Sequence, residues 1–474
     1  MTHSNEAKAN NTDTNTSPMP QNILTTIQGF IEDLRKDPQG TVKNLQTTAQ
    51  GIFNESGLLK NEGQGLAGEQ APSFIQNGYL FAGKMRRKAG LAPDSNQPVT
   101  FNLLGTPSVL VRGAEGVRYF YDTTKVKRAG AMPAFISGPL FGKGAVHGLD
   151  GQEHLDRKNM MVNLAYDDAR VEQFKHLVAE ETETMLSKWG EQEGNVYDDA
   201  AIAYGRAAFR WAGIPVSDEE MEERAAQCSR LLDTFGSPLT NIVAWRERRS
   251  LDMWYEQIIA KVRSGEMTVG EDSVVAHLAA SDLEDRTAGI ELQNLTRPTI
   301  AVSRFAAFAA AALVENQEWI ERIRHASNGQ LIDVPEAIAF AQEIRRTKPF
   351  VPMLPATAIV DGEVSGCPIK KGQRVLIDIL NTNTGPDWDR PGTFDPSRFL
   401  NVDGESIETF VPQGGGNVRT GHRCPGEKIA VTALSVVVAA LCRPDVRISD
   451  DQEDTTFSWT RMLTRPTTGV RVSR

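Results

Sequence analysis

A single cysteine in a glycine-rich, basic loop places the strongest constraint on what this chain can fold into. Residues 410–427 read FVPQGGGNVRTGHRCPGE and contain Cys424, and an apolar stretch at residues 429–442 follows directly. A thiol at the mouth of a helix, beside His422 and Arg423, is expected to favour the thiolate form. Zinc and iron–sulfur sites need several thiolates, and only one is present locally. A single thiolate on an open loop suits one axial position of haem iron.

Composition and charge narrow the class of protein. The 474 residues can bury a large core, and their formal net charge of −10 argues against nucleic acid as a partner. The four cysteines are scattered without a CxxC pair, which fits a reducing cytoplasm. No signal-peptide pattern is visible, and the longest apolar runs, 305–314 and 429–442, have the length of buried helices. We therefore expect a cytoplasmic protein without a transmembrane segment.

The pattern along the chain predicts two parts, an N-terminal extension over residues 1–70 and a main domain over residues 71–474. Residues 1–20 are rich in Thr, Asn and Ser, which is typical of disorder. Apolar residues then recur at helical spacing from Ile23 to Leu34 and predict an amphipathic helix. We favour a helical hairpin that packs on the main domain over a helix that binds a membrane surface or a partner.

The main domain is predicted to be mainly α-helical with small β-sheets. Residues 101–104 and 108–112, separated by Gly105-Thr-Pro107, predict a β-hairpin. Helical patterns dominate from residue 117 to residue 346. Residues 356–360, 367–369 and 374–379 predict short strands near the C-terminal end.

A Glu–Arg pair and a second arginine precede the cysteine loop. Glu343 and Arg346 share one face of a predicted helix, and Arg398 follows within the run FDPSRF. Alone, such a pair is usually a solvated surface pair. In this order, the motifs resemble those of the cytochrome P-450 superfamily. The resemblance implies a structural cluster of these three residues and Cys424 as the axial ligand of haem b. It also implies a haem between a long central helix and the helix after the cysteine loop.

The predicted central helix departs from the usual pattern of that superfamily, which places an acid–alcohol pair there. No acidic residue occurs from residue 293 to residue 313, and Arg297 precedes Pro298 in an apolar stretch. A buried arginine needs an anion, although Pro298 could equally begin a helix with Arg297 exposed at its cap. Arg-Pro at this place resembles the fatty-acid peroxygenase branch. The resemblance implies that Arg297 binds a substrate carboxylate and that Pro298 belongs to the same catalytic site.

The stretch from residue 120 to residue 158 also resembles the peroxygenase branch. The resemblance implies that His147 lies above the haem as a catalytic residue. It also implies that Arg128, His154, Lys158 and His422 contact the haem propionates. The plain alternatives are a structural role for His154 and a solvated charge for Lys158.

A set of apolar residues is predicted to shape the substrate tunnel, although each could equally belong to the core. Val351 occupies a place where some members of the branch have glycine, which leaves the position of oxidation open. The set is Met132, Leu140, Phe141, Phe350, Val351 and Met353.

The resemblance implies an enzyme that oxidises long-chain fatty acids with hydrogen peroxide and needs no redox partner. Hydroxylation at the α or β carbon and decarboxylation to a terminal alkene are both expected. The carboxylate held by Arg297 would serve as the general acid–base that the central helix lacks. A conventional monooxygenase using dioxygen and a redox partner, and a non-catalytic haem-binding sensor, are the alternatives.

Overall fold

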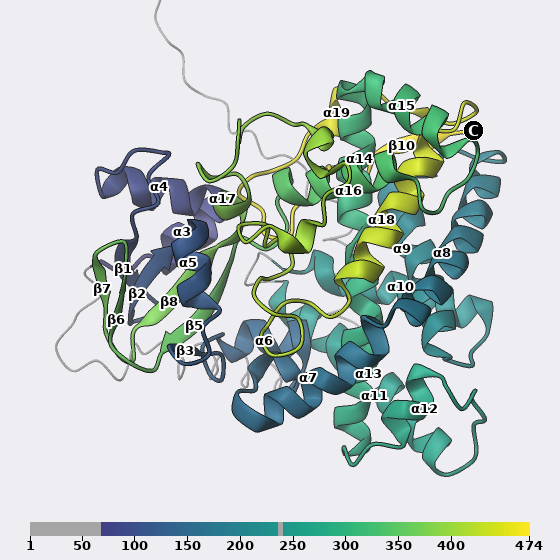
Figure 1. Ribbon diagram of the computed structural model, residues 1–474. Coiled ribbons are helices and arrows are strands. Elements are labelled where there is room, and N and C mark those ends of the chain that lie inside the picture. Colours follow the sequence, from purple (N-terminus) through teal and green to yellow (C-terminus); the bar gives the residue numbers. More distant parts are fainter. Residues whose placement is uncertain (1–67, 236–239) are drawn as a thin grey trace, which may run out of the picture. The chain divides into compact units, whose positions relative to one another are not determined.

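The computed structural model describes residues 68–235 and 240–474 of the chain. The helix expected near residues 23–34, and nearly all of the predicted extension, lie outside the described residues and stay predictions. The described part is mainly helical with small sheets, as the sequence predicted, and Figure 1 shows its elements.

The helices and strands alternate irregularly along the chain. The helices are α3 (Ala71–Asn77), α4 (Phe81–Lys88), α5 (Gly113–Phe120), α6 (Ala134–Phe141), α7 (Gly151–Ala165), α8 (Asp168–Trp189), α9 (Val196–Ala212), α10 (Asp218–Asp233), α11 (Asn241–Arg263), α12 (Val274–Ala279), α13 (Asp285–Ala301), α14 (Ser303–Glu315), α15 (Gln317–Ser327), α16 (Pro335–Thr347), α17 (Ile379–Asn383), α18 (Glu427–Leu441) and α19 (Gln452–Thr455). The strands are β1 (Val99–Leu103), β2 (Thr106–Val111), β3 (Val126–Lys127), β4 (Gly194–Asn195), β5 (Met353–Ala358), β6 (Gly362–Val364), β7 (Cys367–Ile369), β8 (Arg374–Asp378), β9 (Arg447–Ile448) and β10 (Arg471–Ser473). Short 3₁₀ turns are η1 (Gly78–Leu80), η2 (Val146–Gly148), η3 (Pro396–Phe399) and η4 (Gly404–Ser406).

The largest sheet has the strand order β1-β2-β8-β5-β3. It confirms the predicted hairpin, because β1 and β2 pair antiparallel. The tight turn lies at Leu104 and Gly105, which both have positive φ, rather than over Gly105-Thr-Pro107. Pro107 is instead part of β2, at a point where only β1 pairs with it, because the ladder to β8 begins at Ser108. The sheet therefore joins strands from residues 99–127 with strands from residues 353–378.

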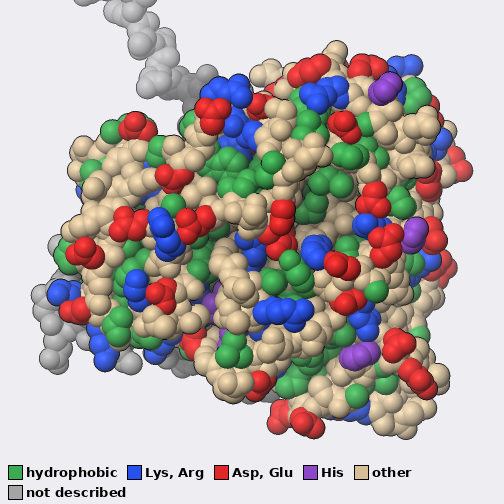
Figure 2. Space-filling view, viewed as in Figure 1, with side chains coloured by type: hydrophobic (Ala, Val, Ile, Leu, Met, Phe, Trp, Pro, Cys, Tyr) green, Lys and Arg blue, Asp and Glu red, His purple; other side chains and the backbone are tan. Residues whose placement is uncertain are grey.

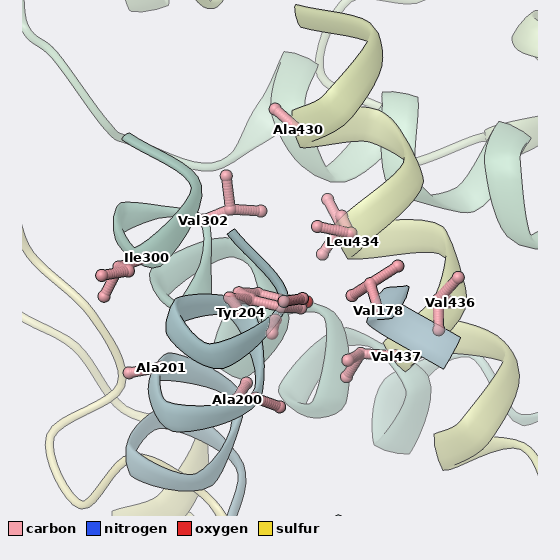
Figure 3. Close-up of a cluster of buried hydrophobic side chains, with 14 of the residues drawn as sticks. Val178, Ala200, Ala201, Tyr204, Ile300, Val302, Ala430, Leu434, Val436 and Val437 are labelled. Carbon is pink, nitrogen blue, oxygen red and sulfur yellow. The ribbon is translucent and has the colours of Figure 1, made fainter. Parts of the chain in front are cut away.

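The core of the helical part surrounds one long central helix. Helices α13 and α14 are separated only by Val302, which itself keeps right-handed helical angles. In Figure 3, Ile300 and Val302 lie beside Tyr204 of α9, with Leu434 of α18 close by. The alanine-rich sequence of α14 leaves little side-chain volume and lets neighbouring helices approach closely.

The central helix corrects one expectation about apolar segments. Residues Asp285–Glu315 form a helix long and apolar enough to cross a membrane by length and composition. The sequence had predicted only a short apolar run at residues 305–314. However, 83% of the most apolar window is buried inside the protein, as is usual for a core helix. On the face drawn in Figure 2, acidic and basic side chains are intermingled.

Candidate active site

The cysteine loop needs its glycines to reach its conformation. Gly414 and Gly416 have positive φ, and a Cβ on Gly415 would lie 2.6 Å from Val411 and 2.9 Å from Tyr121. The backbone N–H of Cys424 donates to the carbonyl oxygen of a loop residue, Gln413, at 3.2 Å. Helix α18 begins at Glu427, three residues after the cysteine. The loop therefore places the thiol just before the N-terminus of a buried helix.

The charges around Cys424 differ from the expectation. Burial raises the pKa of its thiol, and Lys158 is the largest influence that lowers it. Arg423 instead pairs with Glu427, with Nε 2.6 Å from Oε2. Burial also lowers the pKa of His422 to about 2, so this ring is uncharged at neutral pH. The prediction that His422 and Arg423 stabilise the thiolate is therefore wrong, because His422 is uncharged and the positive charge of Arg423 is paired with Glu427. Lys158 of α7 is the largest favourable influence instead.

Four predicted haem contacts lie close together, and we call Arg128, His154, Lys158 and His422 the basic cluster. The rings of His154 and His422 stack with centroids 4.2 Å apart. The Lys158 ammonium donates to the carbonyl oxygen of Arg423 and is almost fully buried, so the alternative of a solvated charge is wrong. The Arg128 guanidinium lies 3.8 Å from the centroid of the Phe120 ring.

Two members of the basic cluster, Arg128 and Lys158, carry positive charge, and Asp150 is the acid that acts on Arg128. Burial lowers the pKa of Lys158 to about 8 and that of Arg128 to about 10. The pKa of His422 is lowered further by the other three members of the cluster. Cationic groups gathered away from water favour an anionic ligand. These residues therefore fit a haem, in which the Cys424 thiolate would hold the iron and the cations of the basic cluster would hold the propionates.

Arg297 lies within the central helix, and its side chain is buried. Pro298 is inside α13, so the alternative that it begins a helix with Arg297 exposed at the cap is wrong. One Nη of Arg297 donates to the carbonyl oxygen of Leu140, and its Nε has no partner among the described residues. Burial lowers its pKa to about 10, and the nearby Arg248 adds to this shift. The guanidinium therefore stays charged at neutral pH without a carboxylate of its own.

His147 lies in η2, stacked face to face on Phe141 with ring centroids 3.9 Å apart. The side chain of His147 is exposed by surface area, although protein atoms surround it at longer range and reduce its contact with bulk water. This desolvation, followed by the charges of Lys158 and Arg297, lowers its pKa to about 3. The imidazole is therefore neutral at physiological pH.

Sequence reasoning missed Glu291, which holds the segment that carries His147. This fully buried carboxylate accepts from the backbone N–H of Val146 at 2.9 Å and from Arg157 at 2.8 Å. Glu291 lies two residues before the acid-free stretch of residues 293–313. An acidic residue inside an otherwise apolar helical stretch was the available signal. Its neighbour Asn294 donates to the carbonyl oxygen of Phe141 at 3.0 Å.

The predicted tunnel residues do not all lie in one environment. Phe350 stacks on Phe305 of the central helix with centroids 4.9 Å apart. Met353 packs in a separate core cluster with Phe81 and Leu376, and its role as a tunnel residue stays a prediction. The remaining predicted tunnel residues are partly buried, namely Met132, Leu140, Phe141 and Val351.

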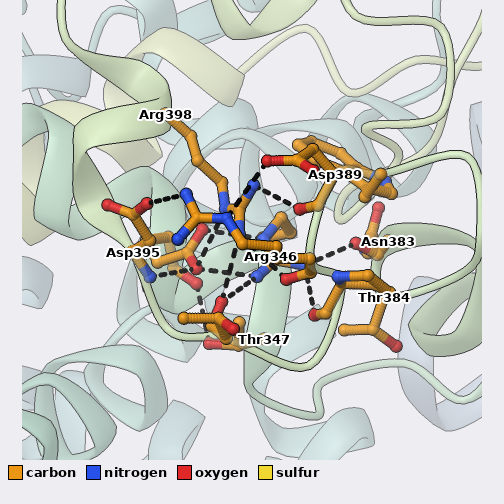
Figure 4. A network of polar contacts seen from close by, with 12 residues as sticks. Arg346, Thr347, Asn383, Thr384, Asp389, Asp395 and Arg398 are labelled. Atoms are coloured by element: carbon orange, nitrogen blue, oxygen red, sulfur yellow. Dashed lines mark hydrogen bonds and ion pairs between the residues drawn. The ribbon is translucent and has the colours of Figure 1, made fainter.

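The predicted Glu–Arg–Arg cluster forms, and it is buried (Figure 4). Arg346 binds both carboxylate oxygens of Glu343 at 2.7 Å, and both side chains are fully buried. The Nε of Arg398 lies 3.8 Å from the same carboxylate. Arg346 also donates to backbone carbonyl oxygens of Pro391 and Thr393, which fixes the loop before η3 onto α16.

Comparisons with known proteins agree with this geometry. A family model described as cytochrome P-450 matches residues 310–473. The ligand-free structure of cytochrome P-450 OleT superposes with a TM-score of 0.79 and 28% identity, covering 87% of this chain and 97% of that one. Cytochrome P-450SP alpha (CYP152B1), in complex with (R)-ibuprophen, superposes with a TM-score of 0.76 and 32% identity, covering 85% and 98%. Sterol 14α-demethylase of Mycolicibacterium vanbaalenii is 24% identical over 390 residues, 72% of this chain and 82% of that protein.

A thiol placed just before a buried helix, beside buried cationic side chains, is the arrangement expected of the class of haem-thiolate proteins. Together with the structural matches over nearly the whole length of both solved proteins, this means that the chain belongs to the cytochrome P-450 family, in its fatty-acid peroxygenase branch.

Proposed function

We propose that this protein is a haem-thiolate peroxygenase that oxidises long-chain fatty acids with hydrogen peroxide. The observation that carries the proposal is Arg297, a buried guanidinium in the central helix with no carboxylate partner of its own among the described residues. An unpaired buried charge is costly, so the site favours an anionic substrate group. A variant of cytochrome P-450 OleT has been solved in complex with arachidonic acid, a fatty acid with this group.

The basic cluster and Cys424 are the residues that would hold haem b. The thiol would bind iron, and Arg128, His154, Lys158 and His422 would bind the propionates. When bound, a thiolate-ligated haem supplies the oxidation chemistry that cleaves the O–O bond of peroxide. The buried cations of the basic cluster support this assignment, because propionate carboxylates would pair with Arg128 and Lys158.

Arg297 would bind and orient the substrate. Its planar guanidinium can bind a carboxylate through two parallel hydrogen bonds, which fixes the direction of the acyl chain. Anchoring the carboxylate determines that the α and β carbons, rather than the far end of the chain, lie at the reaction centre. The anchored carboxylate can also carry the proton that peroxide cleavage transfers, as a general acid–base. Pro298 belongs to the same helical turn.

His147 would assist as an uncharged hydrogen-bonding group. Its stack on Phe141, and the bond between Val146 and Glu291, hold the ring in place. A neutral imidazole can both donate and accept a hydrogen bond, so it can order water or pass on a proton. We expect that this influences the ratio of hydroxylated to decarboxylated product, and that both products form.

The residues of the central helix favour hydrogen peroxide as the oxidant over dioxygen supplied with a redox partner. Its buried acid, Glu291, is already bonded to Val146, Arg157 and Asn294. A carboxylate held by three partners is poorly suited to deliver protons repeatedly to a bound ligand. The scattered, unpaired cysteines support a cytoplasmic location.

The test mixes the purified holoprotein with a long-chain fatty acid and hydrogen peroxide and identifies the products by mass spectrometry. We expect α- or β-oxidised products without any reductase. Arg297→Leu is expected to reduce this turnover about a hundredfold or more, because orientation is lost. Arg286→Gln, an exposed arginine on the same helix, is the matched control and should keep full activity.

Two results would contradict the proposal. Product that forms only with dioxygen and a reductase identifies a conventional monooxygenase. Loss of haem absorbance without any oxidised product identifies a haem-binding protein that does not turn over fatty acids.

A further inference from the structure

A second buried arginine lies beside Arg297. Arg248 of α11 is almost fully buried, and its Nε donates to Asp252 at 2.6 Å, one helical turn further along. Its Nη1 lies 3.5 Å from the carbonyl oxygen of Leu140, the same oxygen that accepts from Arg297. The two guanidinium groups therefore meet at one backbone oxygen, at the end of α6.

The local charges do not balance. Asp252 is the anion that acts on both arginines. Burial raises the pKa of Cys228 to about 12 and the pKa of Tyr255 well above its ordinary value, so both groups are neutral. Two guanidinium charges and one carboxylate leave an excess of one positive charge in a buried place. That excess matches a single monoanion.

Arg248 also has a hydrogen-bond donor, Nη2, that is held in a fixed position. Its Nη2 is buried and has no hydrogen-bond partner within residues 68–235 and 240–474. A Cβ on Gly142, which has a φ of 90°, would lie 2.2 Å from this nitrogen. Only glycine leaves room for the guanidinium at the end of α6, and Asp252 fixes its other side. A fixed buried donor without a partner is costly unless a ligand uses it.

We propose that Arg248 is the second guanidinium of the carboxylate site, so that Arg248 and Arg297 together bind one carboxylate of the fatty acid. This inference rests on the proposed function and extends it to substrate selection. Two charged donors favour an ionised carboxylate over neutral groups of similar size. The site would therefore discriminate fatty acids from fatty alcohols, although the acyl chains of both fit the same tunnel.

The experiment measures binding of palmitate and of 1-hexadecanol to the holoprotein, by calorimetry and by the absorbance change of the haem. Arg248→Gln is expected to weaken palmitate binding about tenfold, with little change for 1-hexadecanol. Arg286→Gln is the matched control, because this exposed arginine lies 3.9 Å from the same Asp252. It should bind both ligands as the wild type does.

A second variant controls for misfolding, because Arg248→Gln alone leaves the Asp252 carboxylate buried without its partner and could destabilise the fold. Arg248→Gln combined with Asp252→Asn removes both charges, and it should keep the carbon monoxide spectrum of the wild type while still binding palmitate weakly. If both Arg248 variants bind palmitate as tightly as the wild type does, the inference is overturned. An equal loss for palmitate and 1-hexadecanol would also overturn it, because that pattern indicates a purely structural role.

Arg297→Leu separates this inference from the proposed function. If Arg297→Leu weakens palmitate binding and the Arg248 variants do not, Arg248 is not part of the site and the proposed function stands. If neither change affects palmitate binding, both proposals fail.

Discussion

The thiol of Cys424 has charged neighbours that come from distant parts of the chain. Lys158 lies 266 positions before the cysteine and yet lowers its pKa more than any other group. Arg423, its direct neighbour, is bound by Glu427. The helix N-terminus and a buried lysine therefore lower the pKa of this thiol, rather than the basic residues next to it in the sequence.

Cys424→Ser should remove the spectral signature of thiolate ligation. We expect the carbon monoxide complex of the reduced protein to lose the red-shifted band typical of a thiolate-bound haem, because serine does not replace the thiolate. Cys367→Ser is the control, since Cys367 lies in β7 and is partly exposed. A red-shifted band that survives in Cys424→Ser would exclude this residue as the ligand.

His147 should not titrate in the physiological range. Burial lowers its pKa to about 3, so the ring stays neutral above about pH 4 and gains a proton only in stronger acid. Any effect of His147 on the product ratio should therefore be constant from about pH 5 to about pH 8. The measurement compares the ratio of hydroxylated to decarboxylated product in the wild type and in His147→Gln across this range. A change in this product ratio at about pH 6.5 in the wild type, absent in His147→Gln, would show that the ring titrates normally.

Helix α13 organises the site at the scale of elements. Glu291, Asn294 and Arg297 are spaced three residues apart, and each bonds to the segment from α6 to η2. Their partners are Val146, Phe141 and Leu140. One helix therefore positions His147, the end of α6 and the proposed carboxylate anchor together.

The ion pair within α16 should matter far more than a similar pair on α15. Glu343→Gln leaves the fully buried Arg346 guanidinium without its carboxylate, so we expect the free energy of unfolding to fall by about 3–5 kcal/mol. Glu321→Gln breaks a pair with Arg324 of the same i, i+3 spacing, but both side chains are substantially exposed. This control should lose less than about 1 kcal/mol. Denaturant unfolding measures both, and equal losses would contradict a structural role for the buried cluster.

At the scale of the whole molecule, the described residues contain all of the proposed site residues. Cys424, the basic cluster and Arg297 all lie between residues 128 and 424, and 87% of the chain covers 97% of the OleT structure. The hydrophobic core under the central helix is likewise built from residues 146–472. The first 67 residues supply none of these side chains.

A chain that starts at residue 68 should therefore keep its peroxide-driven turnover, because every proposed site residue lies after that position. Sedimentation with anionic lipid vesicles tests the alternative that the extension contains a membrane-surface helix. We expect the full chain and the shortened chain to stay equally in the supernatant. Vesicle binding that is lost on shortening would contradict this expectation, whereas a fall in Tm is the result that the predicted hairpin packed on the main domain would give.

Patterns of local spacing predicted much of the fold and part of the site. Glu343 and Arg346 pair because residues three apart share a helix face, and the β1–β2 hairpin forms around a turn that contains Gly105. Arg297 followed by Pro298 was visible as a charge in an apolar stretch. These features depend on neighbours within a few residues, so periodicity and turn chemistry are enough to find them.

Tertiary packing decided the charge and burial of the same side chains. Spacing left open whether Arg297 is exposed at a cap or buried, and packing of α13 against α9 and α11 settled it. Lys158 next to Cys424, and Arg248 next to Arg297, pair groups from separate helices. The physical reason is that desolvation and Coulomb interactions depend on distance in space, and helices far apart along the chain create those distances only when they pack.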